Sequence, residues 1–331
     1  MRLTEREILS ILKGAPAARI NGDRVIPERF TALQRTGYPS DLVRYPRVDC
    51  HKATLDFFTD AEAVTVGYAD AWTGPDPALF SFDVLENGVL TSHLGTDVST
   101  ETVLRAPDGA ATAGLRPGKK RVTVYLPAFF HVEITHVELV GATFFRPYVH
   151  PGRFLAFGDS ITEGFHAVRP SMTYVNQLSR LLDREAVNYA VDGEISRPGT
   201  VTPGTYPDCD FVLAAYGTND SANRKVPATF GADLSDFHRR LHEAFADKPV
   251  FILLPIWRKT AEKVCSLGTL QDISQRISES AADYPNFHVV DCIDLIPHDL
   301  NLFHDGVHPL DRGMEYYALG LEPEIRKVMG W

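Results

Sequence analysis

The sequence predicts an antiparallel β-sandwich followed by a three-layer α/β/α domain with a parallel sheet. In the first 150 residues, short β-branched and aromatic runs alternate with turn residues, which is typical of antiparallel sheets. From residue 154 onward, continuous apolar runs alternate with helical patterns, which indicates a parallel sheet covered on both faces. We place the boundary in a proline-bounded stretch, giving domains 1–148 and 149–331.

The first half opens on a predicted short helix. Thr4 and Glu7 have the spacing of a capping box, an apolar face that includes Leu12 follows, and Gly14 is the expected stop. Asn87-Gly88 between two strand-like runs predicts a hairpin. The expected strands cover Ala53–Phe58, Ala63–Tyr68, Leu79–Val84, Arg121–Leu126 and His131–Val140, with a breaker at residues 73–77.

The second half alternates between strand and helix patterns. Expected strands are Phe154–Phe157, Ala186–Val191, Phe211–Tyr216, Val250–Leu254 and His288–Val290. Apolar residues at helical spacing predict helices carrying Tyr174 to Leu182, and over Phe230–Phe245, Leu270–Ala281 and Gly313–Val328.

Composition excludes several classes of function. The net charge of −10, with scattered basic residues, argues against a nucleic-acid partner. No run approaches the roughly 18 apolar residues of a membrane helix, and charged residues interrupt every candidate signal sequence. We therefore expect a cytoplasmic protein without a membrane partner. The widely spaced cysteines favour free thiols over a zinc site or disulfides: Cys50, Cys209, Cys265 and Cys292.

Polar blocks follow the strands of the second half, where open parallel sheets gather functional groups. Three come directly after strands and the fourth precedes the last helix. These blocks are Gly158-Asp159-Ser160-Ile161-Thr162-Glu163-Gly164, Asn188-Tyr189-Ala190-Val191-Asp192-Gly193, Gly217-Thr218-Asn219-Asp220 and Asp305-Gly306-Val307-His308-Pro309.

These blocks, in this order, resemble the SGNH (GDSL-type) hydrolase superfamily over residues 154–321. The resemblance implies a flavodoxin-like α/β/α catalytic domain. The four signature residues of that family would be Ser160, Gly193, Asn219 and His308. Residues 169–174 and 305–313 resemble the subgroup with an amino-terminal β-domain, which includes family-two carbohydrate esterases and a salicylyl acyltransferase of tetracycline biosynthesis. The resemblance of residues 1–150 is architectural only.

The chemistry of the blocks is consistent with nucleophilic catalysis. A serine hydroxyl needs a neighbouring base, which His308 can supply, and Asp305 can hold the other ring nitrogen. The resulting triad is Ser160, His308 and Asp305, and we expect its rate to fall below about pH 6. The backbone N–H groups of Ser160 and Gly193 and the side-chain amide of Asn219 would form the oxyanion hole.

Each residue also has a simpler interpretation. Alone, Ser160 would be a helix N-cap and Asn219 a turn residue. Asp305 and His308 could hold a metal together with His304, but no further ligand cluster supports such a site. Trp257, Arg258 and His304 are candidate substrate-binding residues, although structural roles are favoured for the first two.

We therefore predict a serine esterase acting on short acyl esters, acetyl foremost, of a carbohydrate or glycoside, with no metal or organic cofactor. One alternative is an acyltransferase that moves an acyl group onto a secondary-metabolite alcohol. A second is a non-catalytic carbohydrate-binding protein. The oligomeric state is not predicted.

Overall fold

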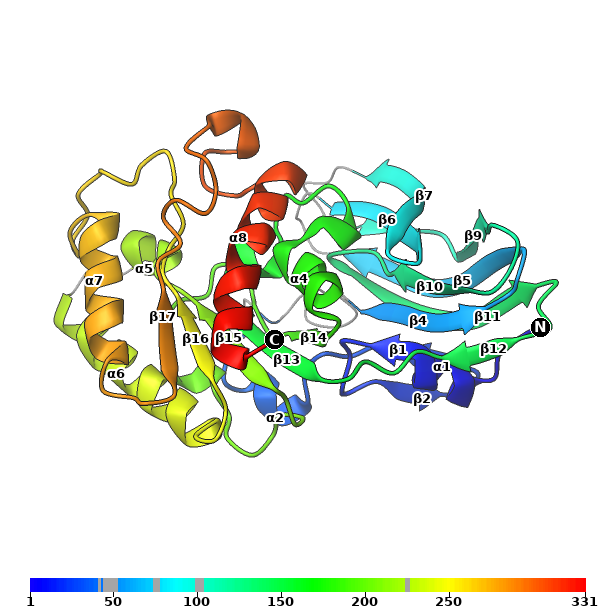
Figure 1. Cartoon of the computed structure of the whole chain (residues 1–331), viewed down its shortest axis with the longest axis horizontal. Helices are drawn as coiled ribbons and strands as arrows, with labels where there is room; N and C mark the ends of the chain where they lie inside the picture. Colours follow the sequence, from blue (N-terminus) through cyan, green and yellow to red (C-terminus); the bar gives the residue numbers. More distant parts are fainter. Residues whose placement is uncertain (41–42, 44–52, 74–77, 99–103, 224–226) are drawn as a thin grey trace. The chain divides into compact units, whose positions relative to one another are not determined.

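The computed structural model divides the chain into two compact units, each described here by itself (Figure 1). Unit 1 comprises Met1–Thr31, Val43–Pro151 and Val168–Ser171, and unit 2 comprises Ala32–Leu42, Gly152–Ala167 and Met172–Trp331. The domain boundary between residues 148 and 149 stays a prediction. The structure describes residues 1–40, 43, 53–73, 78–98, 104–223 and 227–331.

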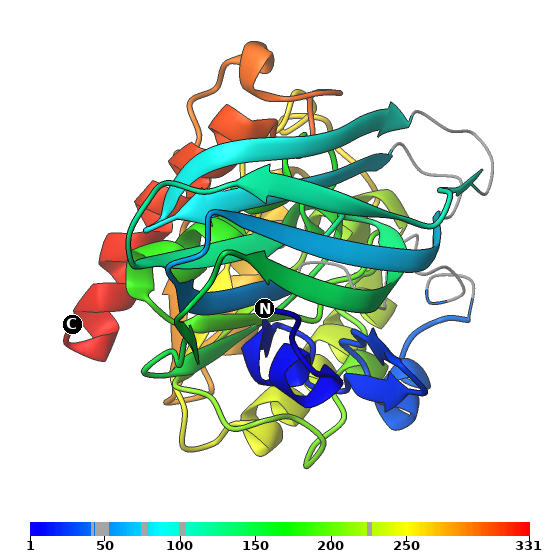
Figure 2. The same cartoon turned by 90° about the vertical axis from the view of Figure 1, so that its right-hand side faces the viewer.

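Unit 1 is a β-sandwich of two antiparallel sheets, seen face on in Figure 2. One sheet has the order β1 (Leu12–Lys13), β4 (Thr54–Thr59), β10 (Lys120–Tyr125), β6 (Ala78–Glu86) and β7 (Val89–Val98), with β12 (Phe145–Pro147) also on β4. The other has the order β2 (Arg19–Asn21), β3 (Arg24–Ile26), β11 (Phe130–Val140), β5 (Ala63–Thr73) and β8 (Leu104–Arg105), with β9 (Gly109–Gly114) also on β5.

The predicted sandwich is confirmed, and all five expected strands coincide with β4, β5, β6, β10 and β11. The hairpin at Asn87-Gly88 joins β6 to β7. Both residues have positive φ, 50° and 82°, as a two-residue turn of type I′ requires. The sequence pattern missed the length of β5, and residues 74–77 of the expected breaker lie outside the described residues.

The amino-terminal helix is α1 (Glu5–Ile11), and its capping box between Thr4 and Glu7 is present in both directions. The expectation that the helix continues to Gly14 is wrong. Leu12 leaves the helix and pairs with Leu55 as part of β1. Strand pairing with β4 therefore outweighs the helical spacing of the leucine.

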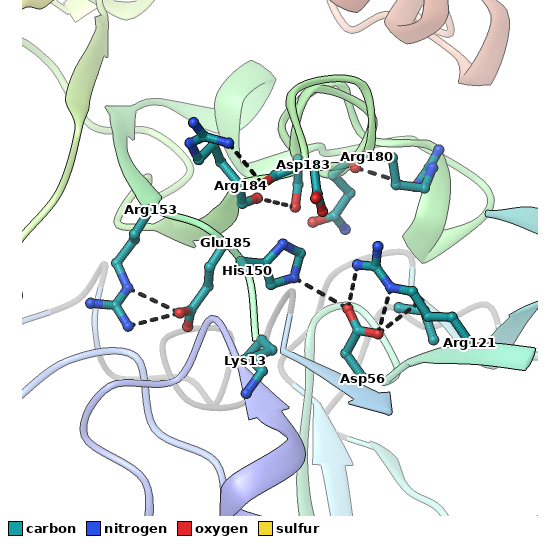
Figure 3. Close-up of polar contacts among 12 residues, drawn as sticks. Lys13, Asp56, Arg121, His150, Arg153, Arg180, Asp183, Arg184 and Glu185 are labelled. Carbon is teal, nitrogen blue, oxygen red and sulfur yellow. Dashed lines mark hydrogen bonds and ion pairs between the residues drawn. The ribbon is translucent and has the colours of Figure 1, made fainter. Parts of the chain in front are cut away.

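A buried charge cluster ties β4 to β10 and to the end of the sandwich (Figure 3). Asp56 is 2% exposed, and Arg121 donates to its two carboxylate oxygens over 2.9 and 2.7 Å. The His150 ring lies 3.2 Å from the same carboxylate, and the Arg121 guanidinium stacks on Tyr148. Burial opposes ionisation, but the hydrogen bonds from Arg121 and His150 outweigh it and lower the pKa of Asp56. Side chains far apart in sequence thus fix the last residues of the sandwich.

Unit 2 contains a parallel five-stranded sheet of the order β14 (Glu185–Asn188), β13 (Arg153–Gly158), β15 (Phe211–Ala215), β16 (Val250–Leu253) and β17 (Phe287–Val290). Numbered along this unit, the order is 2-1-3-4-5, which is the flavodoxin-like arrangement. Arg153 and Glu185 open neighbouring strands and form an ion pair of 2.7 Å (Figure 3). The predicted α/β/α class is therefore confirmed.

Within the described residues, the four longest helices of unit 2 match the helical patterns of the sequence: α4 (Tyr174–Leu182), α6 (Pro227–Ala244), α7 (Leu270–Ala281) and α8 (Asp311–Met329). Shorter helices lie outside those patterns: α2 (Ala32–Arg35), α3 (Ser160–Glu163) and α5 (Thr218–Asn223). Short 3₁₀ turns occur at η3 (Pro198–Thr200) and η4 (Leu300–Leu302), and a further one, η2 (Pro170–Met172), has residues in both units. Helices α4 and α8 pack together over one sheet face, and α6 packs on α7 (Figure 1).

One strand of unit 2 is shorter than expected. The apolar run to Val191 predicts three more residues for β14, which ends at Asn188. The Asn188 side-chain oxygen Oδ1 accepts from the Ala190 N–H, and the side-chain amide Nδ2 donates to the Thr162 backbone carbonyl. This buried asparagine turns the chain out of the sheet and ties it to the loop after β13.

Two further expectations concern membrane-spanning segments and the cysteine thiols. Within the described residues no helix is long and apolar enough to span a bilayer. Cys209, Cys265 and Cys292 are free, and burial raises the pKa of Cys209 and of Cys292 to about 12. Cys50 lies outside the described residues.

Candidate active site

The turn between β13 and α3 presents Ser160. Asp159 is the N-cap, because its carboxylate accepts from the Ile161 N–H at 3.0 Å, so Ser160 is the first helical residue and not the cap. Gly164 ends this one-turn helix with a φ of 87°. A side chain at Gly158 would collide with the Thr162 side chain 2.4 Å away, so only glycine permits the turn to fold this tightly.

The loop between η4 and α8 carries Asp305 and His308. The Nδ1 atom of His308 lies 2.8 Å from Asp305 Oδ2, and the Asp305 Oδ1 atom accepts from the backbone N–H groups of Val307 and His308 at 2.9 Å. Partial burial favours the neutral acid, but these hydrogen bonds outweigh it and hold the pKa of Asp305 well below its usual value. Asp305 is therefore a carboxylate at neutral pH.

Ser160 and His308 meet although 148 positions separate them. Ser160 Oγ lies 2.8 Å from His308 Nε2, and both side chains belong to unit 2. Hydroxyl, imidazole and carboxylate thus form one continuous hydrogen-bonded line. With the ring proton on Nδ1, His308 donates to Asp305 and accepts from Ser160, which is the arrangement that activates a serine hydroxyl.

Gly193 and Asn219 come from neighbouring turns. Gly193 follows β14 with a φ of 78°, and Asn219 lies in the first turn of α5. The Asn219 amide donates to the carbonyl of Glu194 at 3.0 Å, which joins the two turns directly. An asparagine amide has two N–H groups, so one remains for a ligand.

Buried acidic residues hold these turns in place, and the sequence analysis assigned none of them this task. Glu163 is fully buried and accepts from the Asp192 N–H at 2.7 Å. Asp220 is fully buried and accepts from the hydroxyl of Ser196 at 2.7 Å and from the N–H of Gly217 at 3.1 Å. These carboxylates therefore link the loops that follow three different strands.

Two more buried acids have raised pKa values. Complete burial raises the pKa of Asp159 to about 7, and the nearby carboxylates of Asp220 and Asp192 add to the rise. Burial also raises the pKa of Glu194, against hydrogen bonds from Ile195 and Arg197. One sequence signal could have identified such residues. An acidic residue inside a turn block that contains glycines is a candidate for a buried carboxylate, although acids in turns are usually assumed to be exposed.

The three remaining candidate residues lie in different environments. His304 stacks on His166, with ring centroids 3.9 Å apart, and its backbone N–H donates to the His308 carbonyl. Arg258 instead donates to the Thr218 carbonyl and to Ser221 Oγ, so it braces α5. Trp257 stacks on His298 and packs against Phe303.

The sequence also gave no reason to single out His166. Its φ of 65° is in the left-handed region, and its ring lies 5.4 Å from that of His308. Burial, together with the neighbouring imidazoles of His304 and His308, lowers the pKa of His166 to about 4. This imidazole is therefore neutral beside the triad at neutral pH.

The sequence matches a known family model in this unit. Residues 156–316 match the GDSL-like Lipase/Acylhydrolase family, a span that contains all the candidate catalytic and oxyanion residues. No curated protein matches the chain at a significant level.

Solved structures share the architecture of the whole chain. The salicylyl-acyltransferase SsfX3 from a tetracycline biosynthetic pathway superposes with a TM-score of 0.78 at 20% identity, over 96% of this chain and 94% of that one. A GDSL-like lipase from Bacteroides ovatus gives 0.74 at 18% identity, over 100% and 98%. A family two carbohydrate esterase from Cellvibrio japonicus gives 0.64 at 17%, over 97% and 95%. At these identities the likeness shows the fold.

Proposed function

The chain carries a GDSL/SGNH lipase–acylhydrolase domain, and on this premise we propose that it is a serine esterase with the triad Ser160, His308 and Asp305. The observation that carries the proposal is the hydrogen-bonded line of these three side chains, with 2.8 Å at each step. The carboxylate of Asp305 keeps the ring proton on Nδ1, so that Nε2 is free to accept.

In the proposed reaction, Ser160 Oγ attacks the ester carbonyl while His308 Nε2 takes the hydroxyl proton. His308 then gives this proton to the departing alkoxide, which leaves as an alcohol, and an acyl-serine ester forms. In the second half His308 takes a proton from water, the hydroxide attacks the acyl-serine, and Ser160 leaves with that proton. The chain's own residues supply every proton carrier in both halves.

For the oxyanion we propose the backbone N–H groups of Ser160 and Gly193 and the free amide N–H of Asn219. The Asn219 contact with Glu194 supports this role, because it fixes the amide beside the turn of Gly193. Preorganised donors stabilise the charge that develops on the carbonyl oxygen, and loss of one typically costs about 100- to 1,000-fold in kcat. Asn219→Ala is therefore expected to lower kcat by that factor.

As substrates we propose short acyl esters, acetyl foremost, of a carbohydrate or glycoside. The family two carbohydrate esterases among the structural neighbours support this class. The match to a salicylyl-acyltransferase over nearly the whole chain supports a second candidate, transfer of the acyl group to an alcohol. In that reaction an alcohol replaces water at the deacylation step. Both candidates use the same acyl-enzyme, and a cytoplasmic location stays a prediction from the sequence.

The test of the nucleophile is the mass of the intact protein after rapid mixing with p-nitrophenyl acetate and acid quenching. We expect one added acetyl group, located on the peptide that contains Ser160. Ser160→Ala should carry none and lose at least about 1,000-fold in kcat. Ser274→Ala, a change on the α7 surface, is the matched control. An acetylated Ser160→Ala protein with undiminished turnover contradicts the proposal.

Partitioning of the acyl group separates the two candidates. With p-nitrophenyl acetate as donor, sugars and other alcohols are added and the yields of acetate and of acetylated alcohol are compared. An esterase releases acetate at all alcohol concentrations, whereas a transferase diverts most of the acetyl group at millimolar alcohol. The result assigns the acceptor without altering the nucleophile.

A further inference from the structure

Around the proposed triad the structure gathers more imidazoles than the esterase mechanism uses. His166 and His304 stack with centroids 3.9 Å apart and ring planes 18° from parallel. The His166 ring also lies 5.4 Å from the His308 ring, and Asp305 binds the latter. Three histidines and a carboxylate therefore meet beside Ser160, and only His308 and Asp305 have a role in the reaction.

Three of these side chains can converge on one point. Single ligand atoms of His166, Asp305 and His308 lie within 4.8 Å of one another. Donor atoms of a tetrahedral zinc site lie about 3.3 Å apart, since zinc–nitrogen bonds are about 2.0 Å. Each donor would have to move by about 1 Å. Asp305 is partly exposed, with 42% of its side chain accessible.

The donor set is suited to one class of ion. Two imidazoles and one carboxylate are preferred by zinc and its transition-metal neighbours, whereas calcium and magnesium prefer oxygen donors alone. We propose that His166, Asp305 and His308 bind a divalent transition-metal ion, zinc foremost, and that the bound ion reversibly blocks the esterase. The binding part stands by itself, and the blocking part rests on the proposed function.

The inhibition follows from the loss of the nitrogen lone pairs of His308, which the bound ion occupies. Coordination through Nε2 of His308 removes the lone pair that accepts the Ser160 proton. Coordination through Nδ1 breaks the hydrogen bond to Asp305 and moves the ring proton to Nε2, which can then no longer accept the proton of Ser160. Either geometry leaves the serine without a working base. The stacked ring of His304, or water, can complete the tetrahedron.

A second cluster of potential ligands, in unit 1, does not carry the same inference. Asp70, His131 and Glu133 also have donor atoms within 4.8 Å of one another. There the Arg24 guanidinium already forms an ion pair with Glu133, at 2.5 Å. A metal ion at this place would face an existing positive charge.

Metal binding is tested first without any esterase activity. The Ser160→Ala protein is titrated with Co²⁺, whose visible absorption reports nitrogen and carboxylate ligands. We expect one equivalent to bind and Zn²⁺ to displace it. In the Ser160→Ala background, His166→Asn should weaken Co²⁺ binding by at least about tenfold. Asparagine is chosen because it tolerates the left-handed backbone of His166 better than most residues. Equal affinities with and without His166→Asn overturn the site.

Inhibition is tested separately on the protein with Ser160. Hydrolysis of p-nitrophenyl acetate is measured against Zn²⁺ concentration, with each variant scaled to its own metal-free rate, and is restored with a chelator. His166→Asn should raise the half-inhibiting concentration by at least about tenfold. His298→Asn, which removes a histidine outside the cluster, should leave it unchanged. An equal rise in both variants, or none in His166→Asn, overturns the block. If the chain hydrolyses no ester at all, the proposed function fails and the Co²⁺ result still decides the metal site.

Discussion

Two buried aspartates, one in each unit, are stabilised in opposite ways. In unit 1, Asp56 is 2% exposed and is paired with the guanidinium of Arg121 and the ring of His150. In unit 2, Asp159 is 3% exposed and accepts a backbone N–H from Ile161. The pKa of Asp56 is lowered, whereas burial raises that of Asp159 to about 7.

The difference shows that buried acids have different roles in the two units. In the sandwich, opposite charges compensate one another across neighbouring strands, so removal of one partner leaves an unpaired charge and destabilises the fold. Around Ser160, acids bind backbone N–H groups of the catalytic loops, which fixes the position of those loops. We therefore expect substitutions in the first group to change stability and substitutions in the second to change the rate.

Among the substitutions that test this comparison of buried acids, Asp220→Asn has the largest expected effect. Asp220 accepts from Ser196 and Gly217, and an amide would present N–H groups to one of these donors. The adjacent Asn219 would shift with it, so kcat for p-nitrophenyl acetate should fall about 100-fold with little change in KM. Asp247→Asn, an exposed control, should keep the wild-type kcat. A normal kcat in Asp220→Asn would remove the distinction between the units.

Asp56→Asn should show the opposite pattern. The amide keeps one acceptor for Arg121 but leaves its guanidinium without a counter-charge. We expect a loss of about 2 kcal/mol in the free energy of unfolding, measured by urea titration, because one partner of a largely buried pair is neutralised. The kcat of the folded variant should stay within about twofold of wild type. A hundredfold loss of rate without loss of stability would contradict this assignment.

A smaller effect is expected for Glu163→Gln. Glutamine retains a carbonyl oxygen that can accept from the Asp192 N–H, so the loop keeps its main contact. What is lost is the charge-assisted strength of the hydrogen bond, and kcat should fall by about tenfold. Glu163→Leu, which has no acceptor, should lose clearly more. Equal rates for the two variants would mean that Glu163 does not position the loop through this bond.

The smallest expected effects are changes in how the free energy of unfolding varies with pH. Asp56 has a lowered folded pKa, so its contribution is fully present above about pH 4, and it is lost as the pH falls below that value and through the folded pKa. Asp159 has a raised folded pKa, so the folded state holds its proton longer and stability falls as pH rises from about 4 to about 7. Thermal unfolding between pH 3 and pH 8 measures both slopes.

Against wild type, Asp159→Asn should therefore gain in melting temperature as the pH rises from 4 to 7, since asparagine is an equally good N-cap. The deficit of Asp56→Asn should shrink below pH 4. Parallel curves for the two variants would show that the acids are not stabilised in opposite ways.

The sequence predicted the candidate catalytic residues better than the buried residues that hold their loops in place. Parallel strands end at one edge of a sheet, so the three blocks placed after strands were expected to meet there. The fourth block precedes the last helix, and its His308 lies beside Ser160. The glycines of these blocks could be recognised because they mark the turns at the ends of the strands. The antiparallel half was predicted from the alternation of β-branched runs and turns, which depends only on local pattern.

The supporting residues could not be predicted in the same way. Glu163 is a good helix former in a short helix, and nothing local shows that its carboxylate is buried against Asp192. The His166 ring packs against Phe165 and against His304, and the second of these contacts joins residues far apart in the sequence. Leu12 left its predicted helix because β4, more than forty residues later, pairs with it. The features that the sequence did not predict therefore depend on contacts outside the local sequence pattern.

The long sequence separation between Ser160 and His308 has a consequence for biosynthesis. A ribosome adds about 5 to 20 residues per second, so roughly 7 to 30 seconds pass between the translation of the serine and that of its base. During this interval the nascent chain carries an unactivated hydroxyl, because the imidazole that must deprotonate it has not been made. Translation thus delays the onset of reactivity until almost the whole of unit 2 has been synthesised.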